Sequence, residues 1–235
     1  MSYESVVITN DRERWLAAGS PPVPTLVLDG TAHVLQHPGQ AATLLGLESP
    51  WTAGDAGPVA ADVDAVVAAW LEIAEATTWD ALLEPLPRLG RTPLALAVDT
   101  FIGIQALTGA YDSGWFHWPG NPVTGETGDA AVVEYEASLV AGIAGRDDLL
   151  AFLRPIAAAW RKVALDHEHV LLVEPGRKVR APRGELSWLE LLEAQRLHAA
   201  QHYRQATTFL RARGHGVPAL DLAQLDGLQL PAVAY

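Results

Sequence analysis

The sequence predicts a mainly α-helical protein, in which a small β-α-β-β-α unit precedes an antiparallel four-helix bundle. Short β-branched segments and hairpin signals are confined to residues 1–47, whereas long stretches after residue 60 carry apolar residues at the helical period. The chain has 235 residues, is 49% hydrophobic and holds eight tryptophans, which is ample for a packed core. We expect an α/β unit over 1–47, a linker over 48–61 and a helical bundle over 62–235.

The first unit is expected to begin with a strand over residues 4–10, followed by a short helix that ends near Ala18. A hairpin follows, with strands over Thr25–Leu28 and Thr31–Gln36 joined by Asp29-Gly30, a dipeptide typical of tight hairpin turns. A helix over Gln40–Leu45 closes the unit.

The bundle is expected to contain helices over 62–76, 92–111, 129–145, 147–170 and 189–210, with a hairpin around Pro175-Gly176. Thr92-Pro93 is the pattern of an N-cap followed by proline at the first helical position. Asp147 is expected to cap its helix, and Gly214 to end the last one. Ser187 and Glu190 have the spacing of a capping box. The apolar tail from Val217 is expected to pack back on the bundle.

Composition excludes several classes of function. The net charge is −12, so no basic stripe is available for a phosphate backbone, and we expect no nucleic-acid partner. The chain has no cysteine, which excludes disulfides and cysteine-ligated zinc. The apolar run 94–110 is short and interrupted by Asp99, so we expect no membrane span. Because the first residues lack the features of a signal peptide, the predicted location is cytoplasmic.

The strongest functional signal is a pair of histidines, His198 and His202, on the last helix. Their four-residue spacing places both rings on one helix face, one turn apart, where two nitrogens can bind a divalent metal. Asp99 is the single carboxylate in the apolar helix over 92–111 and needs a partner there. If the two helices pack together, the three residues form a metal site. The alternative for Asp99 is a structural pair with an arginine such as Arg204.

Other residues are candidates for substrate binding. Gln205 lies about two turns from His198 on the same face, and Gly103 belongs to a face of mostly small residues beside Asp99, which leaves room for a substrate. The loop after residue 112 carries Trp115, Phe116, His117 and Trp118. These form either an aromatic lid, with His117 as an acid/base, or simple hydrophobic cover for the end of the bundle.

Two passages resemble the DinB/YfiT-like superfamily. Residues 194–205 (AQRLHAAQHYRQ) resemble its last helix, and residues 93–101 (PLALAVDTF) resemble the helix that carries its first metal ligand. The resemblance implies a four-helix bundle, often dimeric, that usually binds a divalent metal through three histidines. It also implies a transferase or isomerase that uses a low-molecular-weight thiol. The first of these histidines corresponds to Asp99 here. Two histidines and one carboxylate can bind Zn, Ni, Mn or Fe, but the exchange is also compatible with a metal-free site.

The N-terminal unit resembles the second half of a glutaredoxin or thioredoxin, because Val23-Pro24-Thr25 is followed by a hairpin and a short helix. The cysteine motif of that fold is missing, so thiol–disulfide chemistry is excluded. We interpret the unit as a truncated remnant that serves as a packing surface or dimer contact.

Three functions follow from these observations. The leading one is a metal-dependent transferase or isomerase that acts on a small organic substrate. The second is a metal-free enzyme that uses Asp99, with a pKa raised by burial, and a histidine for proton transfer or cyclisation. The third is a non-catalytic binding or dimerisation protein with a degenerate metal site.

Overall fold

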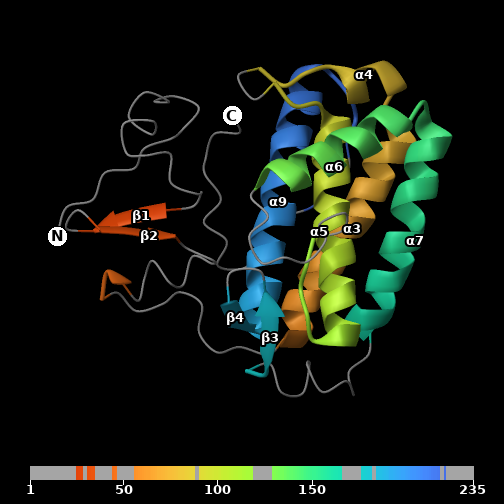
Figure 1. Ribbon diagram of the computed structural model, residues 1–235. Helices are drawn as coiled ribbons and strands as arrows, with labels where there is room; N and C mark the ends of the chain where they lie inside the picture. Colours follow the sequence, from red (N-terminus) through yellow and green to blue (C-terminus); the bar gives the residue numbers. More distant parts are fainter. Residues whose placement is uncertain are drawn as a thin grey trace. The chain divides into compact units, whose positions relative to one another are not determined.

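The computed structural model describes residues 25–28, 31–34, 44–46, 56–87, 90–118, 129–165, 176–181, 184–217 and 220. The chain divides into two compact units, Met1–Pro50 and Trp51–Tyr235. The described residues are mainly helical and include two antiparallel two-stranded sheets, one in each unit (Figure 1).

The described part of the first unit contains a β-hairpin. Strand β1 (Thr25–Leu28) pairs with β2 (Thr31–Val34), and Leu28 faces Thr31 across the turn. This confirms the two predicted strands over the described residues, and the expected end of the second strand, residues 35 and 36, lies outside them. The strand expected over 4–10, the helix near Ala18, the turn residues and most of the helix over 40–45 lie outside the described residues.

The second unit contains the remaining elements. They are α3 (Ala56–Ala76), α4 (Trp79–Leu83), α5 (Pro93–Ser113), α6 (Asp129–Gly142), α7 (Arg146–Leu165), β3 (Lys178–Ala181), β4 (Gly184–Ser187) and α9 (Trp188–Ala212).

The caps predicted for the two helices that carry the candidate site are confirmed. The Thr92 hydroxyl accepts a hydrogen bond from the Ala95 N–H (3.1 Å), and Pro93 is the first residue of α5. Ser187 and Glu190 form a complete capping box at the start of α9. These bonds satisfy N–H groups that the first helical turn leaves without partners, so both helices begin where their sequences indicate.

Several boundaries differ from the predictions. Helix α3 begins at Ala56, inside the range expected to be a linker, because Ala56, Val59 and Ala60 are buried and extend its apolar stripe backward. Pro58 lies in the first turn, where a missing N–H costs little. The five-residue helix α4 was not predicted.

Helices α6 and α7 also differ in their ends. Helix α6 ends at Gly142, three residues before the predicted end, and α7 begins at Arg146. The described part of α7 extends to Leu165, and the predicted end near residue 170 lies outside the described residues. The expected cap, Asp147, lies within the first turn of α7, and Asp148 instead accepts a hydrogen bond from the Ala144 N–H (3.0 Å).

The described part of the second unit also contains a hairpin that was not predicted, in which Ala181 lies opposite Gly184. The hairpin expected around Pro175-Gly176 falls largely on residues 171–175, which lie outside the described residues. Val179 and Leu186 face each other in this register and are both buried, which explains the choice of register.

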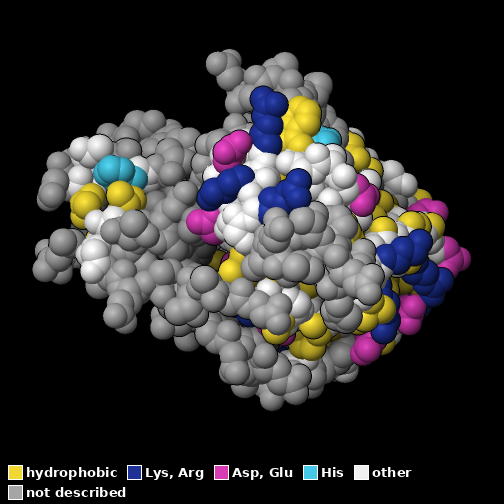
Figure 2. Space-filling model, turned by 90° about the horizontal axis from the view of Figure 1, so that it is seen from below, with side chains coloured by type: hydrophobic (Ala, Val, Ile, Leu, Met, Phe, Trp, Pro, Cys, Tyr) yellow, Lys and Arg dark blue, Asp and Glu magenta, His cyan; other side chains and the backbone are white. Residues whose placement is uncertain are grey.

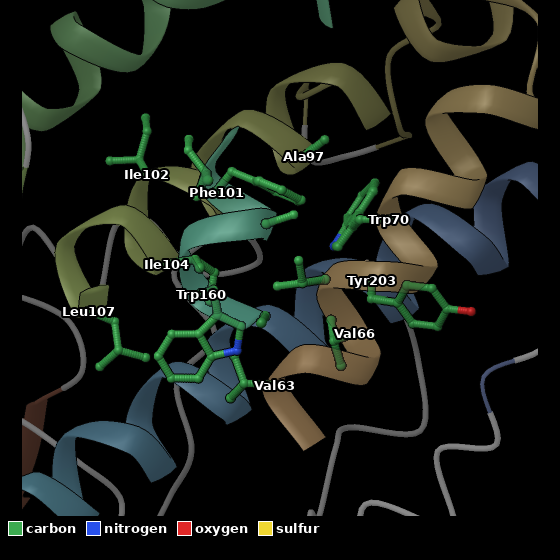
Figure 3. Packing of buried hydrophobic residues seen from close by; sticks show 14 of the residues in the cluster. Val63, Val66, Trp70, Ala97, Phe101, Ile102, Ile104, Leu107, Trp160 and Tyr203 are labelled. Carbon is green, nitrogen blue, oxygen red and sulfur yellow. The ribbon is translucent and has the colours of Figure 1, made fainter. Parts of the chain in front are cut away.

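The long helices of this unit pack in a cyclic order, in which α3 contacts α7 and α9, and α5 contacts the same two helices. Helix α6 packs on α5. The core contains Trp70 from α3, Phe101 from α5, Trp160 from α7 and Tyr203 from α9 (Figure 3). The Trp70 and Tyr203 rings meet edge to face at 6.2 Å. Because α5 and α9 are neighbours in this packing, Asp99 on α5 and the histidine pair on α9 lie on adjacent helices.

The end of α9 and the start of the tail also follow the predictions. Helix α9 ends at Ala212, and Gly214 follows with a φ of 80°, a conformation that favours glycine. Val217 and Leu220 pack against the core, and the Leu220 N–H donates to the Tyr203 hydroxyl (3.1 Å). Residues 221–235 lie outside the described part of the chain.

Candidate metal centre

Asp99, His198 and His202 converge on one point between α5 and α9. The His202 Nε2 lies 3.0 Å and the His198 Nε2 3.6 Å from the same atom, Asp99 Oδ2. Their ligand atoms all lie within 4.8 Å of one another, so this group can hold a metal ion. The expected meeting of the two helices is therefore confirmed.

The cluster is partly buried and still reaches solvent. The exposed fractions of the side chains are 14% for Asp99, 11% for His202 and 26% for His198. The cluster is therefore shielded from most of the surrounding water without being sealed from solvent.

The surroundings of His202 are compatible with a bound metal. Its Nε2 faces Asp99 Oδ2, and its Nδ1 lies 3.0 Å from Gln205 Oε1, so both ring nitrogens face acceptor oxygens. A neutral imidazole has one N–H and can satisfy only one of them. A charged ring would satisfy both, but burial and the neighbouring His198 lower the His202 pKa and favour the neutral form.

Rotation of the Gln205 amide, which would present its NH2 group to Nδ1, satisfies both ring nitrogens without an ion. A cation between Nε2 and Oδ2 satisfies them as well. The N–H at Nδ1 would then donate to Gln205, and the lone pair at Nε2 would be free for the ion, which is the usual arrangement of a metal-binding histidine. Gln205, predicted as a pocket residue, thus lies where it would orient a ligand.

Asp99 is ionised in this environment. Burial by itself would raise its pKa, but hydrogen bonds and charge from His198 and His202 lower it far below the ordinary value. The prediction of an Asp99 pKa raised by burial is therefore wrong, because the two histidines outweigh desolvation. An ionised carboxylate is the form that binds a metal.

Two charged residues beside the cluster were not found from the sequence. Arg91 Nη1 lies 2.9 Å from Asp99 Oδ2, and Arg91 Nη2 lies 2.5 Å from Glu136 Oε1 on α6. The arginine that pairs with Asp99 is thus Arg91 and not Arg204. Burial disfavours its charged form, but Asp99 and Glu136 raise the Arg91 pKa, so the guanidinium stays charged.

Gly103 lies one turn after Asp99, next to Gln195, which lies one turn before His198. A Cβ at position 103 would lie 2.6 Å from Gln195 Oε1 and 3.4 Å from the Trp118 ring, so glycine allows this close approach. Gln195 is buried, and its Oε1 has no hydrogen-bond partner among the described residues. Gln195 was not predicted from the sequence, although its helical spacing from His198 places the two on the same face.

The aromatic loop divides into two parts. The Trp118 ring meets His198 edge to face at 6.1 Å, so this residue lies beside the cluster, and its role in substrate binding stays a prediction. Trp115 instead contacts His117 (5.3 Å between rings) and lies under the Arg180 guanidinium of β3 (5.1 Å). No described contact joins Trp115 or His117 to the cluster, and Phe116 is buried in the core. The acid/base role of His117 stays a prediction.

Strand β3 and the residue before it carry positive charge at the end of the second unit where β3 and β4 lie. Three exposed side chains there are basic, namely Arg177, Lys178 and Arg180. Figure 2 looks at this end and shows several Lys and Arg side chains close together, although the chain as a whole is acidic.

Comparison with known proteins finds no matching family model, no matching curated protein and no matching solved structure. Helix α5 is long and apolar enough to cross a membrane by length and composition alone, but 72% of its most apolar window is buried inside the protein. Such burial is typical of a helix in a protein core.

Proposed function

We propose that the helical unit is a metal-dependent enzyme of the DinB-like four-helix-bundle type, with α3, α5, α7 and α9 as the four helices. The cyclic packing of these helices supports the bundle, and the motif on α9 supports the family. We further propose a transferase or isomerase that acts on a small organic substrate, with a low-molecular-weight thiol as co-substrate. A cytoplasmic location and a homodimer stay predictions from the sequence.

The observation that carries this proposal is the convergence of two Nε2 atoms on Asp99 Oδ2. With bonds of about 2.1 Å, two ligands on one metal are about 3.0 Å apart at a right angle and about 3.4 Å apart at a tetrahedral angle. The distances of 3.0 and 3.6 Å to Asp99 Oδ2 are close to these values. All three ligand atoms lie within 4.8 Å of one another, which is the range over which one ion can bind them.

When bound, a divalent metal supplies a Lewis acid that polarises a carbonyl or stabilises a nucleophile. The residues around the metal would each have a different role. Gln205 orients the His202 ring, and Gln195 offers an acceptor to an N–H or O–H of a substrate. Trp118 covers one side of His198 and excludes water there.

A metal-free acid/base enzyme is the second candidate. The observation that favours it is that Asp99 already has Arg91 and both histidines as partners without any ion. In that case His202 and not Asp99 is the base, because the low Asp99 pKa makes this carboxylate a weak proton acceptor.

Elemental analysis of protein purified without a histidine tag tests the proposal. We expect about one transition metal per chain, lost in Asp99→Ala and in His198→Ala but retained in His215→Ala, which removes a histidine outside the cluster. Metal-free wild-type protein that also fails to take up Zn²⁺, Mn²⁺, Ni²⁺ or Fe²⁺ would contradict it. Activity that survives in this metal-free state and disappears in His202→Gln would favour the acid/base enzyme.

A further inference from the structure

Arg91 contacts the Asp99 oxygen that would bind the metal. Its Nη1 is 2.9 Å from Asp99 Oδ2, the same atom that both histidines face. A guanidinium and a divalent ion repel each other, and one carboxylate oxygen cannot serve both at full strength. A metal at the cluster and Arg91 therefore compete for Asp99 Oδ2, and metal binding weakens the contact between Arg91 and this oxygen.

Glu136 keeps Arg91 near the cluster when its contact with Asp99 weakens. Its Oε1 lies 2.5 Å from Arg91 Nη2, on the opposite branch of the guanidinium from Asp99, and the Ala95 carbonyl accepts from the same Nη2 (3.5 Å). These contacts come from α6 and from the first turn of α5, so they do not depend on Asp99.

Loss of the contact with Asp99 leaves Arg91 Nη1 without its acceptor at a site that is only partly exposed. Arg91 is 29% exposed and Glu136 14%. A charged donor that loses its partner in such surroundings is costly. With neutral imidazoles, Asp99, Glu136 and Arg91 together carry one net negative charge, which a divalent ion turns into one net positive charge. A bound anion would give Arg91 Nη1 a new acceptor and would also neutralise the net positive charge.

We infer that Arg91 is a specificity-determining residue of the metal centre, which releases Asp99 on metal binding and then holds the carboxylate group of a small anionic substrate. This inference rests on the proposed function, since it presupposes a metal at the cluster. It adds the substrate class, because a planar guanidinium matches a carboxylate through two parallel hydrogen bonds.

The first test measures Co²⁺ affinity by competition with a chelator. Arg91→Met removes the competitor and should bind Co²⁺ about tenfold more tightly than wild type. Glu136→Gln removes the anchor that draws Arg91 away and should bind about tenfold more weakly. Arg91→Lys, which keeps the charge, should stay near wild type. Equal affinities in all four proteins would overturn the inference.

The second test titrates the cobalt-loaded proteins with acetate and follows the visible cobalt spectrum. Acetate should bind about 10- to 100-fold more weakly to Arg91→Met than to wild type. Imidazole, a neutral ligand, should bind to both alike. The double variant Arg91→Met/Glu136→Gln leaves no unpaired glutamate behind and should show the same loss, which provides a folded protein if the single variant does not fold.

The metal centre and the role of Arg91 are contradicted by different results. Wild-type protein that binds no Co²⁺ overturns the metal centre and with it the role of Arg91. Co²⁺ binding together with an unchanged acetate affinity in Arg91→Met overturns the role of Arg91 only.

Discussion

Two arginines in the described part of the chain each bind two carboxylates, but only the Arg91 group is a candidate functional site. Arg91 lies between Asp99 and Glu136, at 2.9 and 2.5 Å. Arg196 lies between Asp62 and Glu193, at 2.8 and 2.6 Å. The distances and the charges of the two groups are nearly the same.

The two groups differ in burial and in what faces the aspartate. The Arg196 side chain is 8% exposed and Arg91 is 29% exposed. Two imidazoles face Asp99, whereas Asp62 belongs to no described group of metal-binding side chains. An arginine between two acids thus indicates a structural link, here between α3 and α9. The added histidines and the access to solvent are what turn the Arg91 group into a site.

The comparison predicts the largest loss of stability at Arg196. Arg196→Met leaves two partly buried carboxylates without their cation, and we expect a loss of about 3 kcal/mol, or roughly 6–12 °C in melting temperature. Thermal unfolding followed by circular dichroism measures this. The control is Arg154→Met, which breaks an exposed pair with Glu75 (2.9 Å) and should cost less than about 1 kcal/mol. Equal losses in the two variants would show that Arg196 is not a structural link.

Asp99 should matter more for metal affinity than for folding. We expect Asp99→Asn to weaken Zn²⁺ binding about 100-fold, which is about 2.7 kcal/mol, because it removes a charged ligand. Competition with a chelator gives the affinity. In the Arg196 group, Asp62→Asn should leave Zn²⁺ affinity unchanged. A loss of Zn²⁺ affinity in Asp62→Asn as large as in Asp99→Asn would remove the distinction between the two groups.

Gln205 should have a smaller effect on the same affinity. Gln205→Leu removes the acceptor that orients His202, and we expect Zn²⁺ binding to weaken about tenfold. Gln201→Leu, on the same helix but without a described contact to the cluster, is the matched control. Wild-type affinity in Gln205→Leu would mean that packing alone orients the His202 ring.

The smallest effect concerns pH and Glu193. Burial raises the Glu193 pKa above its ordinary value of 4.5, although Arg196 partly opposes the shift. A carboxylate whose pKa is raised in the folded state destabilises the protein above that pKa, and this cost disappears as the pH falls below about 4.5.

Glu193→Gln should therefore melt slightly higher than wild type at pH 7, and the two should converge near pH 4. Asp99 has a lowered pKa, so metal-free Asp99→Asn should melt lower than wild type at pH 7, and this difference should persist until the pH falls below 3.8. Melting curves across this pH range measure the two shifts in melting temperature. Shifts of the same sign at pH 7 in Glu193→Gln and Asp99→Asn would contradict the opposite pKa changes of the two carboxylates.

Local sequence signals predicted much of the fold. The caps at Thr92 and Ser187 and the strands of the first hairpin depend on neighbouring residues and were confirmed. Boundaries that depend on distant contacts were missed. The start of α3 at Ala56 and the register of Val179 with Leu186 are both determined by burial in the core, which no short window of sequence contains.

In the candidate site, too, local features were predictable and contacts between helices were not. The four-residue spacing of His198 and His202 on a helix by itself determines that the two rings share a face, because the helical repeat is fixed. Only the tertiary structure decided that Asp99 meets them, that Arg91 shares its oxygen, and that Glu136 holds Arg91 from α6. Contacts between different helices depend on how their surfaces pack, and packing is a property of the whole core rather than of any one segment.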